Sequence, residues 1–97
     1  MSGKVACRTP NQDKPGVTNI PEWKFNALRA AILQELAAGD VPFSELGKRA
    51  AQHLSEEDLS NLGSVGWHVT TVKLELEVRG EIGRKSMDGK QVVTLTS

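Results

Sequence analysis

The C-terminal end of the chain carries the signal that most limits the fold. Two segments that we expect to be strands, 82–87 and 90–96, flank the pair Asp88-Gly89. An Asp-Gly pair in this setting favours a two-residue β-hairpin turn, because both turn positions need a positive φ. The resulting register pairs Ile82 with Leu95, Arg84 with Val93 and Lys85 with Val92. We therefore expect a C-terminal hairpin in which Ile82 and Leu95 close the core.

Helical spacing of apolar residues precedes this hairpin. Pro21 suits a first helical turn, and the apolar residues that follow at intervals of three and four are Phe25, Leu28, Ile32 and Leu36. This pattern predicts a helix from Pro21 to about Ala38, ended by Gly39. A short edge strand at 41–43 comes next. Ser44 then caps a second helix to about Leu54, and Ser55 begins one more helical turn.

Residues 65–79 fit two patterns. Leu74, Leu76 and Val78 alternate with glutamates as in a strand, whereas Val65, Val69, Val72 and Leu76 keep helical spacing. We predict a helix, ended by Gly80.

Composition limits the organisation and the location of the chain. Its 97 residues suit one domain, which we place at 21–97 after an N-terminal arm at 1–20 that is rich in Pro, Gly, Asn and Gln. Twelve basic and twelve acidic residues cancel, so any contact with nucleic acid must come from local patches. Cys7 is the only cysteine, and no long apolar run is present. These features favour a cytoplasmic protein without a disulfide or a membrane segment.

The sequence shows no catalytic or metal-binding pattern. It has no glycine-rich phosphate loop, no nucleophile elbow and no helix-borne pair of histidines. His53 and His68 fall in separate predicted elements, and Cys7 has no His or Asp neighbour that would activate it. We therefore predict neither an enzyme nor a bound cofactor or metal.

The order of helix, short strand, helix, helix and hairpin resembles the winged-helix superfamily. The stretch Thr71–Ile82 is similar to its recognition helix and following strand, and Arg84-Lys85 with Asp88-Gly89-Lys90 is similar to its wing. The resemblance implies an α+β fold, with a three-helix core and a C-terminal β-hairpin wing. Gly66-Trp67-His68-Val69 and residues 74–77 look most like a family of small uncharacterised bacterial proteins, which implies no activity.

For the superfamily at large the resemblance implies binding of double-stranded DNA and a role in transcription regulation, with the third helix in the major groove. The residues in position for DNA contact are Thr70, Thr71, Lys73 and Arg79 on that helix and Arg84, Lys85 and Lys90 on the wing. Glu75 and Glu77 flank the same helix, and their charges oppose phosphate contact. The wing cations alternatively serve as solvated charges that keep an edge strand from aggregating.

A second function uses the same fold without DNA. Helical geometry gathers Trp67, Leu74 and Val78 on the outward face of the third helix, together with the two threonines. Such an apolar face is typical of a homodimer or partner interface, or of residues buried beneath the first helix or the arm.

Overall fold

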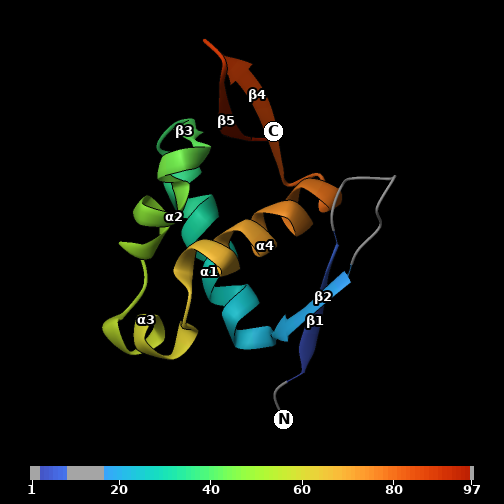
Figure 1. Ribbon diagram of the computed structural model, residues 1–97, viewed down its shortest axis with the longest axis vertical. Coiled ribbons are helices and arrows are strands. Elements are labelled where there is room, and N and C mark those ends of the chain that lie inside the picture. The colour runs from blue at the N-terminus through green and yellow to red at the C-terminus, as the bar shows by residue number, and fades with distance from the viewer. Residues whose placement is uncertain (1–2, 9–16, 97) are drawn as a thin grey trace.

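The computed structural model describes residues 3–8 and 17–96, and expectations for residues 1–2, 9–16 and 97 lie outside this part. The described residues form a small α+β domain with four helices and two antiparallel sheets (Figure 1). The elements are β1 (Lys4–Arg8), β2 (Val17–Pro21), α1 (Glu22–Ala37), β3 (Val41–Pro42), α2 (Phe43–Ala51), α3 (Glu56–Leu62), α4 (Val65–Arg79), β4 (Ile82–Met87) and β5 (Lys90–Leu95).

Helix α4 crosses the centre of the domain and packs on α1, with α2 and α3 to one side and the β1–β2 hairpin to the other (Figure 1). The prediction of a helix over 65–79 is confirmed. Ser64 Oγ accepts a hydrogen bond from the Trp67 N–H at 3.3 Å, and Gly80 ends the helix with a left-handed φ of 77°. Residues 65–79 form a helix and not a strand because helical spacing puts Val69 and Leu76 on one buried face.

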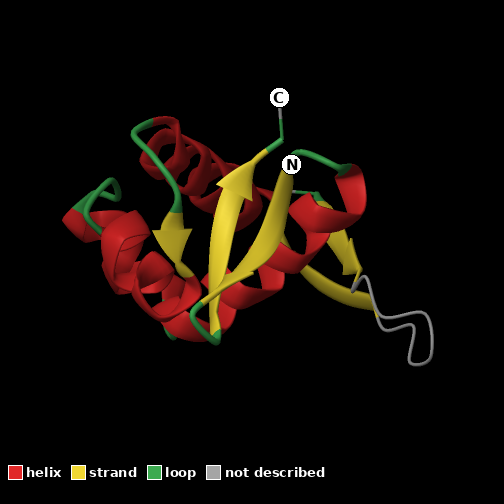
Figure 2. Ribbon diagram, turned by 90° about the horizontal axis from the view of Figure 1, so that it is seen from above, coloured by secondary structure: helices red, strands yellow, loops and turns green. Residues whose placement is uncertain are grey.

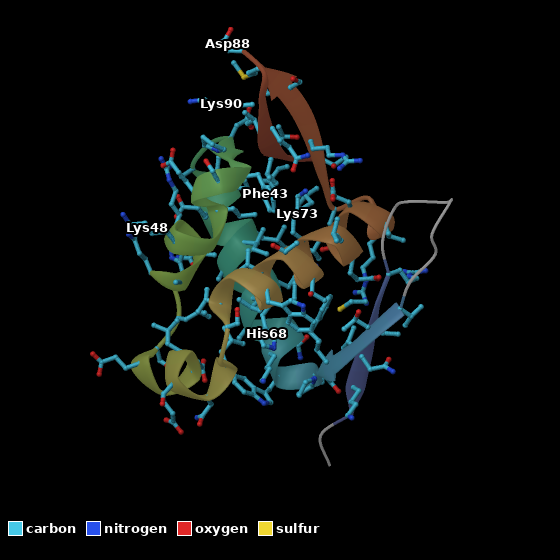
Figure 3. All side chains as sticks on the ribbon, viewed as in Figure 1. Phe43, Lys48, His68, Lys73, Asp88 and Lys90 are labelled. Atoms are coloured by element: carbon cyan, nitrogen blue, oxygen red, sulfur yellow. The ribbon has the colours of Figure 1, made fainter. Side chains whose placement is uncertain are left out.

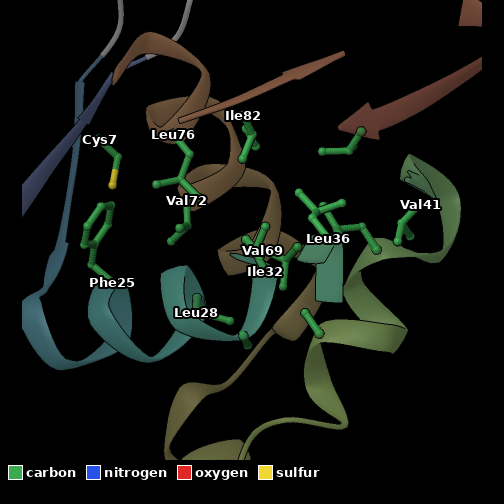
Figure 4. Packing of buried hydrophobic residues seen from close by; sticks show 14 of the residues in the cluster. Cys7, Phe25, Leu28, Ile32, Leu36, Val41, Val69, Val72, Leu76 and Ile82 are labelled. Atoms are coloured by element: carbon green, nitrogen blue, oxygen red, sulfur yellow. The ribbon is translucent and has the colours of Figure 1, made fainter. Parts of the chain in front are cut away.

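The main core lies between α1 and α4 (Figure 4). Every member of the predicted α1 stripe is buried, and the facing residues of α4 are Val69, Val72 and Leu76. Each large apolar side chain buried here stabilises the fold by roughly 1.5–3 kcal/mol relative to its exposed state. The helical spacing of these residues therefore fixes which face of each helix points inward.

The C-terminal hairpin joins β3 in a three-stranded sheet of order β3-β5-β4 (Figure 2). The predicted hairpin register is confirmed at all three predicted pairs. Asp88 and Gly89 have φ values of 52° and 77°, as a turn with two left-handed residues requires. Ile82 and Val93 are buried, but Leu95 is 41% exposed. The expectation that Leu95 closes the core is therefore wrong: Leu95 is the last residue of β5, beyond the buried pair Val92 and Val93.

The described part of the expected arm is a hairpin that contributes to the core. Strands β1 and β2 pair antiparallel, with Cys7 opposite Thr18. Cys7 and Ile20 are each 2% exposed, and the hairpin packs against α4 and α1. Pro21 ends β2, so α1 begins one residue later than predicted.

Two boundaries around α2 differ from expectation. The helix begins at Phe43 after Pro42, so Ser44 does not cap it, and it ends at Ala51 rather than near Leu54. The predicted extra turn is α3, and its cap is confirmed by a 3.1 Å hydrogen bond from the Asp58 N–H to Ser55 Oγ. Among the described helices, none has the length and apolar character that a bilayer crossing needs.

Candidate interaction surface around helix α4

The outward face of α4 is a mixed stripe of apolar residues and threonines. Trp67 is 51% exposed, and the other members are half-buried, namely Thr70, Thr71, Leu74 and Val78. The Thr71 hydroxyl donates to the Trp67 carbonyl at 2.9 Å, which uses its donor within the helix. This face, called the α4 stripe below, therefore offers apolar contact in the main and few free hydrogen-bond donors.

A groove of about 430 Å³ runs beside the stripe, between α2 and the first half of α4. It is lined by Phe43, Ser44, Gly47, Lys48, Ala51, Val65, Gly66, Val69 and Thr70. A Cβ built on Gly47 or Gly66 would meet no atom of the described chain within 4 Å. The α2–α4 groove is therefore hollow partly because these two helical positions lack side chains.

The flank of α4 that faces the C-terminal hairpin holds a buried lysine. Lys73 is 2% exposed, and its Nζ donates to Gln91 Oε1 at 3.0 Å and lies 3.3 Å from Glu77 Oε2. The same ammonium lies 4.4 Å from the centre of the Phe43 ring, a cation–π contact (Figure 3). Lys73 thus joins α4 to β5 and α2. Its ammonium is buried in these contacts, so Lys73 does not present a free charge on the face where the sequence predicts contact with DNA.

Glu77 is the carboxylate of this flank. Its side chain is 7% exposed, and its Oε1 lies 3.5 Å from Arg84 Nε on β4. Within the described residues Oε2 accepts no well-directed hydrogen bond, so its contact with Lys73 is an ion pair only. The Arg84 charge is thus partly offset by a carboxylate from α4.

The opposite flank of α4 binds the N-terminal hairpin through Glu75, which is fully buried. Its carboxylate accepts from Arg8 three times, from the backbone N–H at 2.8 Å and from the guanidinium at 3.0 and 2.8 Å. Arg79 Nε donates to it at 2.7 Å. The Arg8 hydrogen bonds, helped by Arg79 and opposed by burial, lower the Glu75 pKa from 4.5 to about 2. Glu75 is therefore ionised at neutral pH and joins β1 to α4.

The buried Glu75 carboxylate also affects two neighbouring side chains, Arg79 and Cys7. The Arg79 guanidinium lies 4.7 Å from the centre of the Phe25 ring, so Arg79 is held by both a carboxylate and an aromatic face. Burial, and secondarily the Glu75 charge, raise the pKa of the Cys7 thiol. The thiol is therefore protonated at neutral pH and acts as a small apolar residue.

The cations nearer the surface differ in their partners. Lys85 Nζ lies 2.7 Å from Asp40 Oδ2. Lys90 on β5 and Lys48 on α2 have no carboxylate within 4.0 Å in the described part of the chain (Figure 3). Ion pairs this exposed are weak, so a competing anion can replace Asp40.

A family model matches residues 4–92, from β1 into β5. The chain belongs to DUF6958, a family of unknown function. No curated protein and no solved structure matches the chain. Because the matched region includes the N-terminal hairpin, all four helices described above and β4, the α4 stripe and the groove lie within the family's shared segment.

The histidines have local partners. His53 Nε2 lies 2.8 Å from Glu35 Oε1, and His68 Nδ1 lies 2.7 Å from the Ser64 carbonyl oxygen. In the described ranges, no three side chains of His, Cys, Asp or Glu come together as metal ligands would.

The structure unites some predicted site residues and separates others. Trp67, Leu74, Val78 and the two threonines share the α4 stripe, whereas the predicted cations point to two flanks and to the wing. The groove and the place of Lys48 in its lining were not predicted from the sequence. Glycines at 47 and 66, inside segments with helical spacing, were the available signal, since glycine disfavours a helix interior.

Proposed function

We propose that this chain is a protein-interaction module whose binding surface is the α4 stripe together with the α2–α4 groove. The observation that carries the proposal is Trp67, half-exposed on α4, directly following the groove-lining Gly66. Large aromatic residues beside apolar hollows dominate the energetics of protein interfaces. A partner that covers Trp67 and fills the groove would remove both from water.

The charges around α4 support this function over nucleic-acid binding. Lys73 is buried, Arg79 is paired with Glu75, and Arg84 with Glu77. A phosphate approaching α4 would therefore meet cations whose charge is already offset, and the whole chain has no net charge. Apolar contact remains as the main source of affinity on this face.

Binding of double-stranded DNA, as by a winged-helix regulator, is the second candidate function. The sheet order β3-β5-β4, with its hairpin beside α4, favours it, because that order suits a wing next to a recognition helix. Under this function Lys48, Lys85 and Lys90 contact phosphates, while Thr70 and Thr71 face base edges. Lys48 replaces Lys73 among the DNA-contacting residues predicted from the sequence, because Lys73 is buried.

The first function is tested with N-acetyl-tryptophanamide, which presents an indole without a protein. We expect NMR shifts centred on Ala51, Val69 and Thr70 when dilute protein is titrated with this probe. Gly47→Leu fills the groove and should abolish the shifts, whereas Ala30→Leu, on the exposed side of α1, should leave them unchanged. Absence of shifts in the wild-type protein, or equal shifts in Gly47→Leu, would contradict the proposed surface.

The second function is tested by fluorescence anisotropy with labelled duplex DNA at several salt concentrations. The interaction function predicts no salt-dependent binding. Micromolar binding that weakens steeply with salt, and whose salt dependence flattens in a Lys85→Ala/Lys90→Ala variant, would instead establish DNA as the ligand. A Lys4→Ala variant is the matched control, because it removes an exposed lysine from the distant N-terminal hairpin and should leave DNA binding unchanged.

A further inference from the structure

We infer that the partner of this surface is a second copy of the chain, with Trp67 of each copy seated in the α2–α4 groove of the other. The inference rests on the proposed function and names its partner.

One helix carries both the projecting group and a wall of the hollow. Trp67 projects from α4, and the adjacent Gly66, with Val69 and Thr70, lines the groove. A face that holds a knob beside its own hole is self-complementary, which is what a two-fold symmetric interface requires. The groove volume of about 430 Å³ lies within the range of roughly 300–1,000 Å³ that accepts small organic groups, so an indole fits.

The groove glycines point to an occupant from outside the monomer. Glycine inside a helix destabilises it relative to alanine. The φ of Gly47 is not positive, and open space lies where its Cβ would be. Neither the backbone nor packing within the described chain therefore requires glycine at this position. A large side chain entering from a second copy would require it, because any added side chain would occupy the same space.

Charges of both signs lie on α2 and α3, on the same side of the domain (Figure 1). Lys48 on the groove rim lacks a carboxylate within 4.0 Å, and Glu56 and Glu57 at the start of the neighbouring α3 lack a cation at that distance, counting described residues only. Helix α3 lies beside the N-terminal end of α4 (Figure 1). A second copy brings both signs of charge to this face. The zero net charge of the chain means that two copies do not repel each other overall.

The test is sedimentation velocity of the full chain from low to high micromolar concentration. We expect a reversible dimer in the wild type. Trp67→Ala should weaken it about 30-fold, as for a central aromatic anchor. Gly47→Leu should also prevent dimerisation while raising the thermal midpoint of unfolding, because leucine is a better helix former than glycine and open space lies where its Cβ would be. Ala30→Leu should dimerise like the wild type.

A fluorescence measurement detects burial of Trp67 in the dimer while Trp67 and Gly47 are unchanged, so folding defects of the Trp67→Ala and Gly47→Leu variants do not affect it. In a Trp23→Phe background Trp67 is the only tryptophan, and its emission should shift to the blue and resist iodide quenching as concentration rises. A wild-type chain that stays monomeric, or a dimer unaffected by both Trp67→Ala and Gly47→Leu, would overturn the inference. If N-acetyl-tryptophanamide still binds the groove in that case, the interaction function stands and only its partner is wrong.

Discussion

Replacing Glu75 by glutamine should destabilise the domain in a pH-dependent way. Holding the Glu75 pKa at about 2 instead of 4.5 corresponds to about 3 kcal/mol of unfolding free energy at neutral pH. Glutamine keeps the shape and one acceptor oxygen but loses the charge that Arg8 and Arg79 bind. We therefore expect Glu75→Gln to lose about 2–3 kcal/mol at neutral pH.

The sign of the pH dependence follows from the lowered pKa. Stability due to ionised Glu75 is fully present above pH 4.5 and is lost as the pH falls toward about 2. The wild type should therefore approach the variant in stability over this interval, while the variant lacks that component of pH dependence.

Urea unfolding followed by tryptophan fluorescence measures both quantities. With a slope of roughly 1.5 kcal/mol per molar urea, the midpoint of Glu75→Gln should fall by about 1.3–2 M at neutral pH. Glu57→Gln, at an exposed site on α3, should cost less than about 1 kcal/mol. A stability difference between wild type and Glu75→Gln that stays constant from neutral pH to pH 2 would refute the role assigned to the Glu75 charge.

Three further substitutions probe features of the fold and are checked by thermal or urea unfolding. Gly80→Ala should cost about 1 kcal/mol, because alanine is strained at the left-handed φ of 77° that ends α4; an unchanged midpoint would contradict this reasoning. Ser55→Ala should cost about 1 kcal/mol by removing the α3 cap; an unchanged midpoint would mean that this cap does not stabilise the fold. Lys73→Met should cost about 2–3 kcal/mol by leaving Glu77 without its buried partner, and adding Glu77→Leu should recover most of the loss. No recovery in the double variant would mean that Lys73 stabilises the fold mainly through Gln91 and Phe43.

The elements with strong local signals could be predicted from sequence. The hairpin register followed from Asp88-Gly89, and α1 followed from the spacing of its apolar stripe. The ambiguous segment 65–79 was assigned correctly because its buried residues keep helical spacing and Gly80 supplies the left-handed stop. Two helix starts next to prolines differ from their predicted positions: α1 begins at Glu22 after Pro21, and α2 begins at Phe43 after Pro42.

The candidate site could be predicted only in part. Helical geometry placed Trp67, Leu74 and Val78 on one face, since their relative angles depend on the helix alone. The groove could not be predicted, because it exists only where α2 packs against α4 and their glycines leave a hollow.

The sequence by itself determined the order of the elements, the hairpin register and the face that each long helix turns inward, because these depend on periodicity and on the conformations that glycine and proline allow. Only the tertiary structure decided the roles of the charges. Helical angles predict that Lys73 and Glu75 face solvent. In the structure, however, the C-terminal hairpin and α2 cover Lys73, and the N-terminal hairpin covers Glu75. Whether a charged side chain faces water depends on what packs beside its helix, and those neighbours come from segments far away in the chain.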